Sequence, residues 1–394
     1  MKSFAIVLVC YKRLHGIVRL LKSLEMVDYN GRRDITLIFS VDNSGDNNVV
    51  EFANKYNWKY GKKIVRTFPE RQGLKNHILQ CGDYTNEYDI VIILEDDVYV
   101  SNSMYHYAYT AAEFYENEDR VAGISLYSFE KNWLDWVLRF EPQKNQYDAY
   151  FLKVAQSWGQ VWQKNKWDKF KQWYAENSEF THSDKIPEYL NTWPDSSWLK
   201  YHTRYCIETD RFFVYPYIGL STNFSDAGEH ADTMVNDHQV ELISGKKTYN
   251  FIPFSPDAVI YDEYCNRCNI AKYLNLEEKD LTVDFWGTRN PSTYKRYVLT
   301  TAALKYKIIN SFALSLRPIE LSIIYAIPGN DIHLYDTSIP GAPPKNSRYN
   351  LLLYSIRSHD IKAIKFFCIN LFFKETFRTL KRRSLKLKRI LLGK

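Results

Sequence analysis

Three consecutive carboxylates, Glu95, Asp96 and Asp97, end an apolar run in the stretch VIILEDDVYVS, residues 91–101. Like charges this close repel one another and lose hydration in a cleft, so the arrangement is costly unless a cation lies among them. Mg²⁺ or Mn²⁺ suits such a site, because one or two carboxylates hold the ion while substrate phosphates and water complete its shell. In a strand, Glu95 and Asp97 could point into one cleft while Asp96 faces away or turns with the chain. The alternative is a strand that ends in a solvated acidic turn.

The scaffold that would position these acids is predicted to be an α/β fold. Apolar runs bounded by polar or turn residues alternate with helix-like stretches in the first third of the chain. The runs lie at 4–10, 35–41, 64–68, 90–94 and 121–126, and the helix-like stretches at 17–26 and 49–56. This alternation is typical of a largely parallel sheet, whose ligands bind at the carboxyl ends of the strands.

Polar residues follow these predicted strands. Tyr11 and Arg13 come after the first strand, Asp42 after the second and residues 71–77 after the third, while the three acids end the fourth. The section from about 130 to 215 is rich in Trp, Tyr and Lys, and we expect helices there, packed over the open side of the sheet. Its aromatic side chains can stack on sugar rings, but helically spaced Trp residues are more often core.

Four stretches carry a resemblance to a known family. In order, FAIVLVCYKR, IFSVDNSGD, RQGLKNH and VIILEDDVYVS resemble the nucleotide-sugar-binding half of GT-A fold glycosyltransferases, particularly family 2 enzymes and the N-acetylglucosaminyltransferase I type with its Glu-Asp-Asp motif. The resemblance covers roughly residues 1–250. It implies an α/β fold of the GT-A class, a Rossmann-like nucleotide-binding mixed sheet flanked by helices.

The resemblance also implies roles for single residues. Asp97 would coordinate Mn²⁺ or Mg²⁺, and Asp42 would contact the nucleoside. Asp42 could instead form only an Asx turn in DNSG, and His77 could be an ordinary helix residue. The donor-binding candidates together are Tyr11, Arg13, Asp42, Arg71, Gly73, Asn76, His77, Glu95 and Asp96.

A second cluster, residues 193–233, resembles a segment of bacterial family 2-like transferases with an Asp-x-x-Trp at a helix start and a later His-bearing turn. The matching positions are Asp195 to Trp198, Pro216, Asn223 and His230, with departures at Pro194 and Glu229.

Transfer with inversion needs a general base for the acceptor hydroxyl, and Asp195 is the candidate. Its alternative role is N-cap of a helix that starts at Ser196. Asp226 and Glu229 are the fallback acids. His230 could be a third metal ligand or a phosphate contact, the alternative being an exposed loop His.

Composition and charge bound the rest of the protein. The 394 residues, 45% apolar and 25% charged, suit a globular protein of two or three domains. Six scattered cysteines favour a reducing compartment, and the single CxxC at Cys265 and Cys268 is more easily structural than a zinc site. No uncharged apolar stretch approaches the ~18 to 20 residues of a spanning helix. The tail 374–394 holds nine Lys or Arg and one acid, so its net charge is +8. Because the whole chain has a net charge of +6, residues 1–373 carry about −2.

The basic tail follows a pattern of apolar residues spaced by three and four from Ile361, which predicts an amphipathic helix on an anionic membrane surface. The alternative is a solvated basic helix end, and no nucleic-acid partner is expected because the remainder is slightly acidic. We therefore predict a GT-A catalytic domain at 1–290, divided into a nucleotide-sugar-binding half at 1–127 and an acceptor-binding half at 128–290. A helical, basic, membrane-associating region would follow at 291–394.

The predicted activity is a metal-dependent, inverting glycosyltransferase that moves a sugar from a nucleotide-sugar, UDP by family analogy, to a lipid-linked or surface polysaccharide acceptor. The partners would be this donor, a glycan or glycolipid acceptor and a membrane, with the protein cytoplasmic and peripheral on the inner face of the cytoplasmic membrane. One alternative is a non-catalytic membrane-associated scaffold with a transferase-like fold. A sugar nucleotidylyltransferase is disfavoured, because CYKRLHG has one glycine in the wrong place for a phosphate loop.

Overall fold

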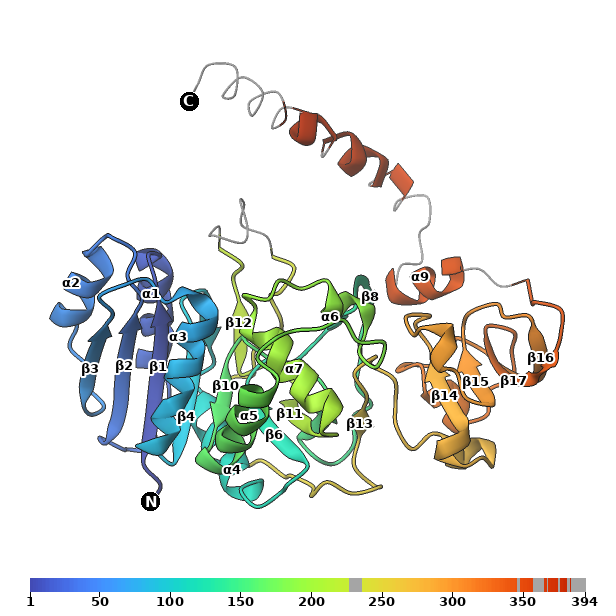
Figure 1. Cartoon of the computed structure of the whole chain (residues 1–394), viewed down its shortest axis with the longest axis horizontal. Helices are drawn as coiled ribbons and strands as arrows, with labels where there is room; N and C mark the ends of the chain where they lie inside the picture. Colours follow the sequence, from blue (N-terminus) through green and yellow to red (C-terminus); the bar gives the residue numbers. More distant parts are fainter. Residues whose placement is uncertain are drawn as a thin grey trace.

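The computed structural model of the chain is a mixed α/β protein built around a nine-stranded sheet (Figure 1). It describes residues 1–226, 236–345, 348–356, 365–366, 368–374, 376–380 and 383. The strand order of the main sheet is β13-β9-β11-β6-β10-β4-β1-β2-β3, with β4, β1, β2 and β3 parallel to one another and β10 antiparallel to both of its neighbours. The predicted fold class, a large mixed sheet flanked by helices, is confirmed.

The nine strands and the helices around them have the following bounds. The strands are β1 (Phe4–Cys10), β2 (Ile35–Val41), β3 (Lys63–Thr67), β4 (Ile90–Glu95), β6 (Val121–Ser125), β9 (Ala149–Leu152), β10 (Gln160–Trp162), β11 (Phe212–Pro216) and β13 (Ile260–Tyr261). The helices are α1 (Leu14–Glu25), α2 (Asn48–Lys55), α3 (Gly73–Gly82), α4 (Met104–Phe114), α5 (Lys164–Glu176), α6 (Glu188–Asn191) and α7 (Trp198–Glu208). A short 3-10 helix, Asp83–Asn86, follows α3.

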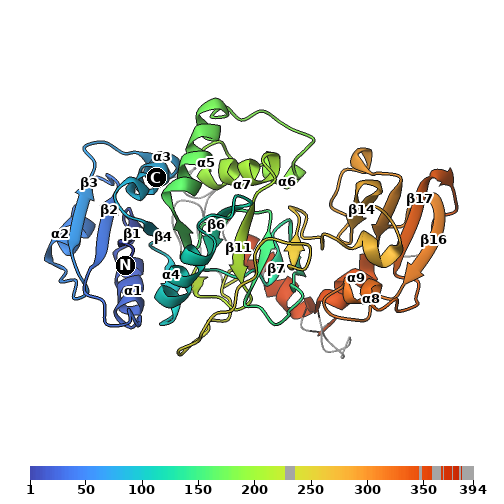
Figure 2. The ribbon, with the colours of Figure 1, turned by 90° about the horizontal axis from the view of Figure 1, so that it is seen from below.

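Strand β1 explains why the first half folds as it does. All seven of its residues are buried, and successive side chains enter two different cores. Phe4, Ile6 and Leu8 pack in the core that includes α1, α2 and α4, whereas Ala5 and Val7 pack in the core that includes α3, α5 and α7. The helices therefore cover both faces of the sheet (Figure 2), as an uninterrupted apolar strand requires.

The aromatic section contributes both helices and strands. Trp162 and Trp167 are buried and stack with their ring centroids 4.2 Å apart, so most of this section is core, as helical spacing suggests. Helices α5 and α7 cover one face of the sheet, but β9, β10 and β11 also come from this section and extend the sheet itself. Two small ladders complete the region: β5 (Val98–Val100) pairs with β12 (Ser221–Asn223), and β7 (Lys131–Asn132) pairs with β8 (Asp135–Arg139).

The expectation of a helical region from residue 291 onward is wrong over most of 291–340. Three strands in this range join one at 281–284 in a four-stranded sheet of order β14-β15-β17-β16, beyond the β13 edge of the main sheet (Figure 1). Its strands are β14 (Leu281–Asp284), β15 (Tyr297–Thr300), β16 (Tyr306–Phe312) and β17 (Ile332–Pro340). Short apolar runs such as YKIINSF do not distinguish helix from strand by periodicity, and here their β-branched residues and long-range pairing favour the strand.

The C-terminal sheet is joined to the segment after β13 by hydrogen bonds between side chains and backbone. The Trp286 indole donates to the Cys265 carbonyl at 3.0 Å, and the Phe285 amide donates to Asn266 Oδ1 at 2.9 Å. Helices α8 (Leu321–Ile324) and α9 (Arg348–Ile356) accompany this sheet, with 3-10 turns at Ala271–Leu274, Glu278–Asp280 and Pro291–Thr293. In the described part of the chain, no helix has the length and apolar character needed to cross a membrane. All six cysteines are free.

Candidate active site

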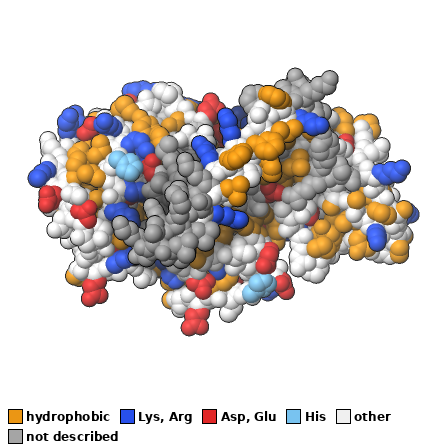
Figure 3. Space-filling model, turned by 90° about the horizontal axis from the view of Figure 1, so that it is seen from above, with side chains coloured by type: hydrophobic (Ala, Val, Ile, Leu, Met, Phe, Trp, Pro, Cys, Tyr) orange, Lys and Arg blue, Asp and Glu red, His pale blue; other side chains and the backbone are white. Residues whose placement is uncertain are grey.

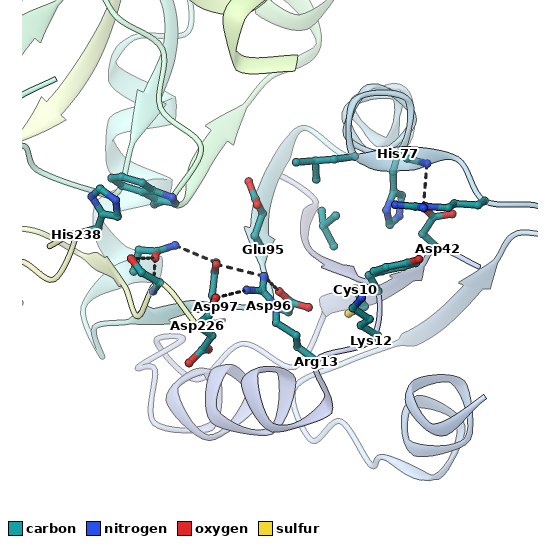
Figure 4. Close-up of a pocket in the computed structure, with 18 residues that line it drawn as sticks. Cys10, Lys12, Arg13, Asp42, His77, Glu95, Asp96, Asp97, Asp226 and His238 are labelled. Carbon is teal, nitrogen blue, oxygen red and sulfur yellow. Dashed lines mark hydrogen bonds and ion pairs between the residues drawn. The ribbon is translucent and has the colours of Figure 1, made fainter. Parts of the chain in front are cut away.

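A cavity of about 350 Å³ opens where β1, β2 and β4 end (Figure 4). Parallel strands bring their carboxyl ends to one edge of the sheet, so residues far apart in the sequence meet there. The cavity is lined by Val9, Cys10, Tyr11, Lys12, Arg13, Asp42, Arg71, Gly73, Leu74, His77, Glu95, Asp96, Asp97, Trp158, Asn223, Ser225, Asp226 and His238.

The three acids all face this cavity, and one predicted donor-binding residue lies among them. Strand β4 ends at Glu95 and β5 begins at Val98, so the chain turns at Asp96 and Asp97 instead of continuing the alternation of a strand. Arg13 forms ion pairs with Asp96 and, at 3.2 Å, with Asp97. The Arg13 guanidinium therefore supplies part of the positive charge that the three acids require.

Negative charge nevertheless remains in excess here, because three carboxylates face one guanidinium. Burial raises the pKa of Asp96 to about 6, against the opposing effect of Arg13. Burial first, and then repulsion from Asp97 and Asp96, raises the pKa of Glu95 above its usual range. No hydrogen bond or ion pair is found for Glu95 within the described residues. The cluster thus favours a further cation, and Figure 4 shows the three side chains gathered at the centre of the cavity.

Asp97 is positioned by the small β5–β12 ladder. Asn223 pairs with Val98 in that ladder, and its side-chain amide donates to Asp97 Oδ1 at 2.9 Å. Within the described residues, no three His, Cys, Asp or Glu side chains come together in a way that could hold a metal ion. An oxygen ligand such as Asp97 fits Mg²⁺ or Mn²⁺, whose remaining ligands in nucleotide sites come from phosphates and water. The fit is therefore to a cation that arrives with a phosphate ligand.

Asp42 lies at the other end of the cavity and fixes the start of α3. Its carboxylate accepts hydrogen bonds from the backbone amides of Gln72 at 2.7 Å, Gly73 at 3.0 Å and Asn43 at 2.8 Å. The alternative considered for Asp42, an Asx turn in DNSG, is made by Asn43, whose Oδ1 accepts from the Gly45 amide at 2.9 Å. Asp42 therefore joins the loop after β2 to the amino end of α3.

His77 lies beneath this end of the cavity and is only 2% exposed. Its Nε2 is 2.7 Å from the Ser40 hydroxyl, and burial lowers its pKa to about 4, so the ring is neutral near pH 7. Nearby, the Arg71 guanidinium lies 5.2 Å from the centroid of the Tyr11 ring. His77 is thus a buried residue of α3 whose side chain also lines the cavity.

Helix α1 approaches the acidic turn closely because of Gly16. A Cβ at Gly16 would lie 2.4 Å from the Asp96 carbonyl oxygen and 3.6 Å from Asp226 Oδ2. One turn further along, Arg19 pairs with the Asp226 carboxylate and stacks 3.7 Å from the centroid of the Phe224 ring. The glycine of CYKRLHG therefore serves helix packing, and Asp226, a fallback acid, is engaged by Arg19.

Two predicted site residues that the structure describes, Asn76 and Asp195, do not line the cavity. Asn76 is on the exposed side of α3. The Asp195 side chain is 70% exposed and pairs with Lys200 Nζ at 2.9 Å. The alternative role as N-cap is excluded, because α7 begins at Trp198 and Ser197 is the N-cap, accepting from the Lys200 amide. His230 and Glu229 lie outside the described residues.

Several cavity residues were not among the predicted site residues. Trp158 and His238 form one wall, and their rings are 4.5 Å apart. Lys12 was within reach of sequence reasoning, because it lies between two predicted residues at the end of β1. Trp158 and His238 were not, because Trp158 carries the same signal as the core tryptophans and His238 lies alone in a polar stretch.

The chain was compared with known proteins. Residues 5–171 match the family described as Glycosyl transferase family 2. No curated protein sequence matches the chain.

Similar solved structures include three transferases. S. aureus TarS 1-349 in complex with UDP is 14% identical with a TM-score of 0.35, and the match covers 62% of this chain and 61% of that one. The mannosyltransferase PcManGT from Pyrobaculum calidifontis with GDP-Man and Mn²⁺ is 11% identical with a TM-score of 0.33, covering 55% of this chain and 57% of that one. GalNAc-T7 with UDP, GalNAc and Mn²⁺ is 11% identical with a TM-score of 0.37, covering 55% of this chain and 43% of that one. The chain thus spans less than two thirds of each. The match over residues 5–171 supports the predicted enzyme class, a glycosyltransferase.

Proposed function

We propose that this protein is an inverting, metal-dependent glycosyltransferase that moves a sugar from a nucleotide-sugar, preferentially a UDP-sugar, to a hydroxyl of a lipid-linked or surface polysaccharide. One observation carries the proposal: a single cavity holds carboxylates in excess around Asp97 and, on its rim, the cations Lys12, Arg13 and Arg71. A nucleoside diphosphate with a divalent cation is complementary to both, since the cations meet phosphate oxygens and the carboxylates meet the metal.

The residues divide the work along the cavity. Asp42 and Tyr11, at the ends of β2 and β1, take the nucleoside, while Arg13 and Arg71 orient the diphosphate. Asp97 holds the metal, which when bound neutralises charge on the departing diphosphate. The acceptor oxygen forms a bond to the anomeric carbon from the face opposite the diphosphate, the bond to the diphosphate breaks with its electron pair, and the hydroxyl proton passes to a base.

Two carboxylates compete for the role of base. Asp195 follows from the family resemblance, but it is exposed and holds the buried ammonium of Lys200. Glu95 lines the cavity and has no hydrogen bond or ion pair among the described residues, so no existing contact must break before it takes a proton. Asp195→Asn and Glu95→Gln separate them, because the asparagine keeps a hydrogen-bond acceptor for Lys200. The base is the residue whose variant binds donor normally but loses at least ~100-fold in transfer rate.

A membrane-bound acceptor is favoured by the C-terminal helical residues. Phe366, Ile369, Phe373, Phe377 and Leu380 follow one another at spacings of three and four and are between 47% and 71% exposed. Figure 3 shows their hydrophobic band with Lys and Arg side chains beside it. An exposed aromatic stripe flanked by basic residues suits the interface of an anionic bilayer. We propose that this helix attaches the enzyme to the inner face of the cytoplasmic membrane.

The test is turnover of a panel of UDP- and GDP-sugars with Mn²⁺, by the parent and by Asp97→Asn. Slow hydrolysis to the nucleoside diphosphate is expected even without acceptor, with at least ~100-fold loss in the variant. Asp119→Asn is the control, since that exposed carboxylate pairs with Lys169 far from the cavity. Equal behaviour of the parent and Asp97→Asn, with no turnover of any donor, would favour the non-catalytic scaffold instead.

A further inference from the structure

An aromatic wall closes the end of the cavity that is remote from Asp42. The His238 ring lies 4.5 Å from the Trp158 ring and 4.6 Å from the Trp136 ring, centroid to centroid. Trp136, Trp158 and His238 are all half-buried, unlike the core tryptophans of α5 and β10. Trp158 and His238 both line the cavity. These three residues are called the aromatic wall below.

Trp158 is held in place by its own turn. The side-chain oxygen of Gln156 accepts from the amides of Ser157 and Trp158, and the Ser221 hydroxyl donates to the Trp158 carbonyl at 2.5 Å. Gly159 follows with φ +97°, a conformation that disfavours other residues, and a Cβ there would press on Ser221 Oγ at 3.0 Å. The indole is therefore presented to the cavity by a fixed backbone.

His238 is anchored on both sides but leaves hydrogen-bonding capacity unused. Asp237 pairs with Lys131 of β7 at 3.7 Å, and the Val240 amide donates to Thr222 of β12 at 2.8 Å. His238 Nδ1 is buried and has no hydrogen-bond partner among the described residues. Buried polar atoms without a hydrogen-bond partner are uncommon, and a ligand that hydrogen-bonds the imidazole would supply the missing partner.

The order of groups along the cavity indicates which ligand would contact His238. In Figure 4, Asp42 and His77 lie at one end, the acids Glu95 to Asp97 in the middle and His238 at the other end. With the nucleoside at the first end and the diphosphate at the acids, the next group outward is a sugar. A pyranose offers an apolar C–H face to an indole and hydroxyl groups to an imidazole.

We propose that the aromatic wall is a pyranose subsite, in which Trp158 packs against the apolar face of a sugar ring and His238 hydrogen-bonds one of its hydroxyl groups. Trp136 positions His238 through an edge-on contact with the imidazole, with the two rings at 71° to each other. This inference rests on the proposed function. The sugar is that of the donor or the first residue of the acceptor, two sources of the same chemistry that the following experiment separates.

The experiment compares the parent with Trp158→Ala, Trp158→Phe and His238→Ala, each first checked for an unchanged thermal unfolding midpoint. Binding of UDP and of the best UDP-sugar is titrated with Mn²⁺, and transfer is assayed against acceptor concentration. The control is His106→Ala, since His106 is also half-buried beside an aromatic ring, that of Tyr249 at 5.7 Å, but is not in the cavity lining.

A donor subsite predicts that UDP affinity stays within twofold, while the advantage of UDP-sugar over UDP falls at least tenfold in both alanine variants. An acceptor subsite predicts unchanged binding of both nucleotides and at least a tenfold rise in acceptor KM. Trp158→Phe should keep part of either effect. The inference is overturned if the parent prefers UDP-sugar over UDP and transfers the sugar, but both alanine variants bind and transfer as the parent does. It is also overturned if His238→Ala loses binding of UDP itself, because His238 would then be a phosphate or metal contact. Failure of the parent to bind any nucleotide-sugar would instead refute the proposed function.

Discussion

Arg13, on the loop after β1, lies 3.2 Å from Asp97, on the turn after β4, Nη2 to Oδ2. The same guanidinium pairs with Asp96 and donates to the Asp226 carbonyl at 3.2 Å. One residue therefore ties the first strand end to the acidic turn and to the segment after β12. Arg13 also shares Asp97 with the proposed metal. The arrangement of the acidic turn therefore depends on the planar, multiple donors of the guanidinium as well as on its charge.

Arg13→Lys should keep the positive charge but lose the fork that contacts two carboxylates and a carbonyl. We expect at least tenfold weaker UDP binding in the presence of Mn²⁺ and a lower thermal midpoint, both measurable on the purified protein. Arg33→Lys is the matched control, because Arg33 is exposed and its hydrogen bond to the Lys59 carbonyl lies away from the cavity. Parent-like UDP affinity in Arg13→Lys would show that the fork is dispensable.

Gly16→Ala should destabilise the protein by ~1–3 kcal/mol, because the added Cβ would overlap the Asp96 carbonyl and force α1 away from the acidic turn. Chemical denaturation measures the change. On the exposed side of the same helix, Lys22→Ala should stay within ~0.5 kcal/mol of the parent. Stability equal to the parent in Gly16→Ala would mean that this close contact does not constrain the helix.

His77 predicts a pH-dependent stability with a definite sign. Its pKa is about 4 in the folded protein and ~6.5 when unfolded, so the unfolded state binds more protons between these values and stability falls as pH drops. The His77 contribution should cost about 2 kcal/mol between pH 7 and pH 5. Denaturation of His77→Gln at both pH values should show a drop smaller by this amount. A drop of the same size in both proteins would contradict the assignment.

Phe373→Ser with Phe377→Ser, in the full chain, should abolish binding to vesicles that contain anionic lipid, measured by co-flotation. Both rings are more than half exposed, so their loss removes membrane contact without removing core packing. Tyr325→Ser, at an equally exposed site outside this helix, is the control. Binding that survives the double change but disappears at high salt would assign attachment to the basic residues alone.

The sequence predicts the parallel half well because there local pattern and burial agree. The runs at 4–10 and 35–41 are the bounds of β1 and β2 themselves, since a strand buried on both faces is uninterruptedly apolar. Nine of the site residues named from strand ends and motifs line the cavity: Tyr11, Arg13, Asp42, Arg71, Gly73, His77, Glu95, Asp96 and Asp97.

Features that depend on tertiary packing cannot be predicted from the local sequence in the same way. Trp158 has the same local signal as Trp162 and Trp167, and only the turn at Gly159 and the β12 contact direct it to the cavity. The strands at 281–340 depend on pairing between distant runs, which periodicity in a single run does not reveal. The position of Asp195 likewise depends on Lys200, in the first turn of α7.

The central claim is that the cavity at the ends of β1, β2 and β4 binds a nucleotide-sugar together with a divalent cation. Calorimetric titration of a UDP- and GDP-sugar panel, with Mn²⁺ or with EDTA, tests it most directly. The account predicts that at least one donor binds with Mn²⁺, binds at least tenfold more weakly with EDTA, and loses the Mn²⁺ advantage in Asp97→Asn. A folded protein that binds none of these donors with Mn²⁺, or binds one equally well in EDTA, would contradict it.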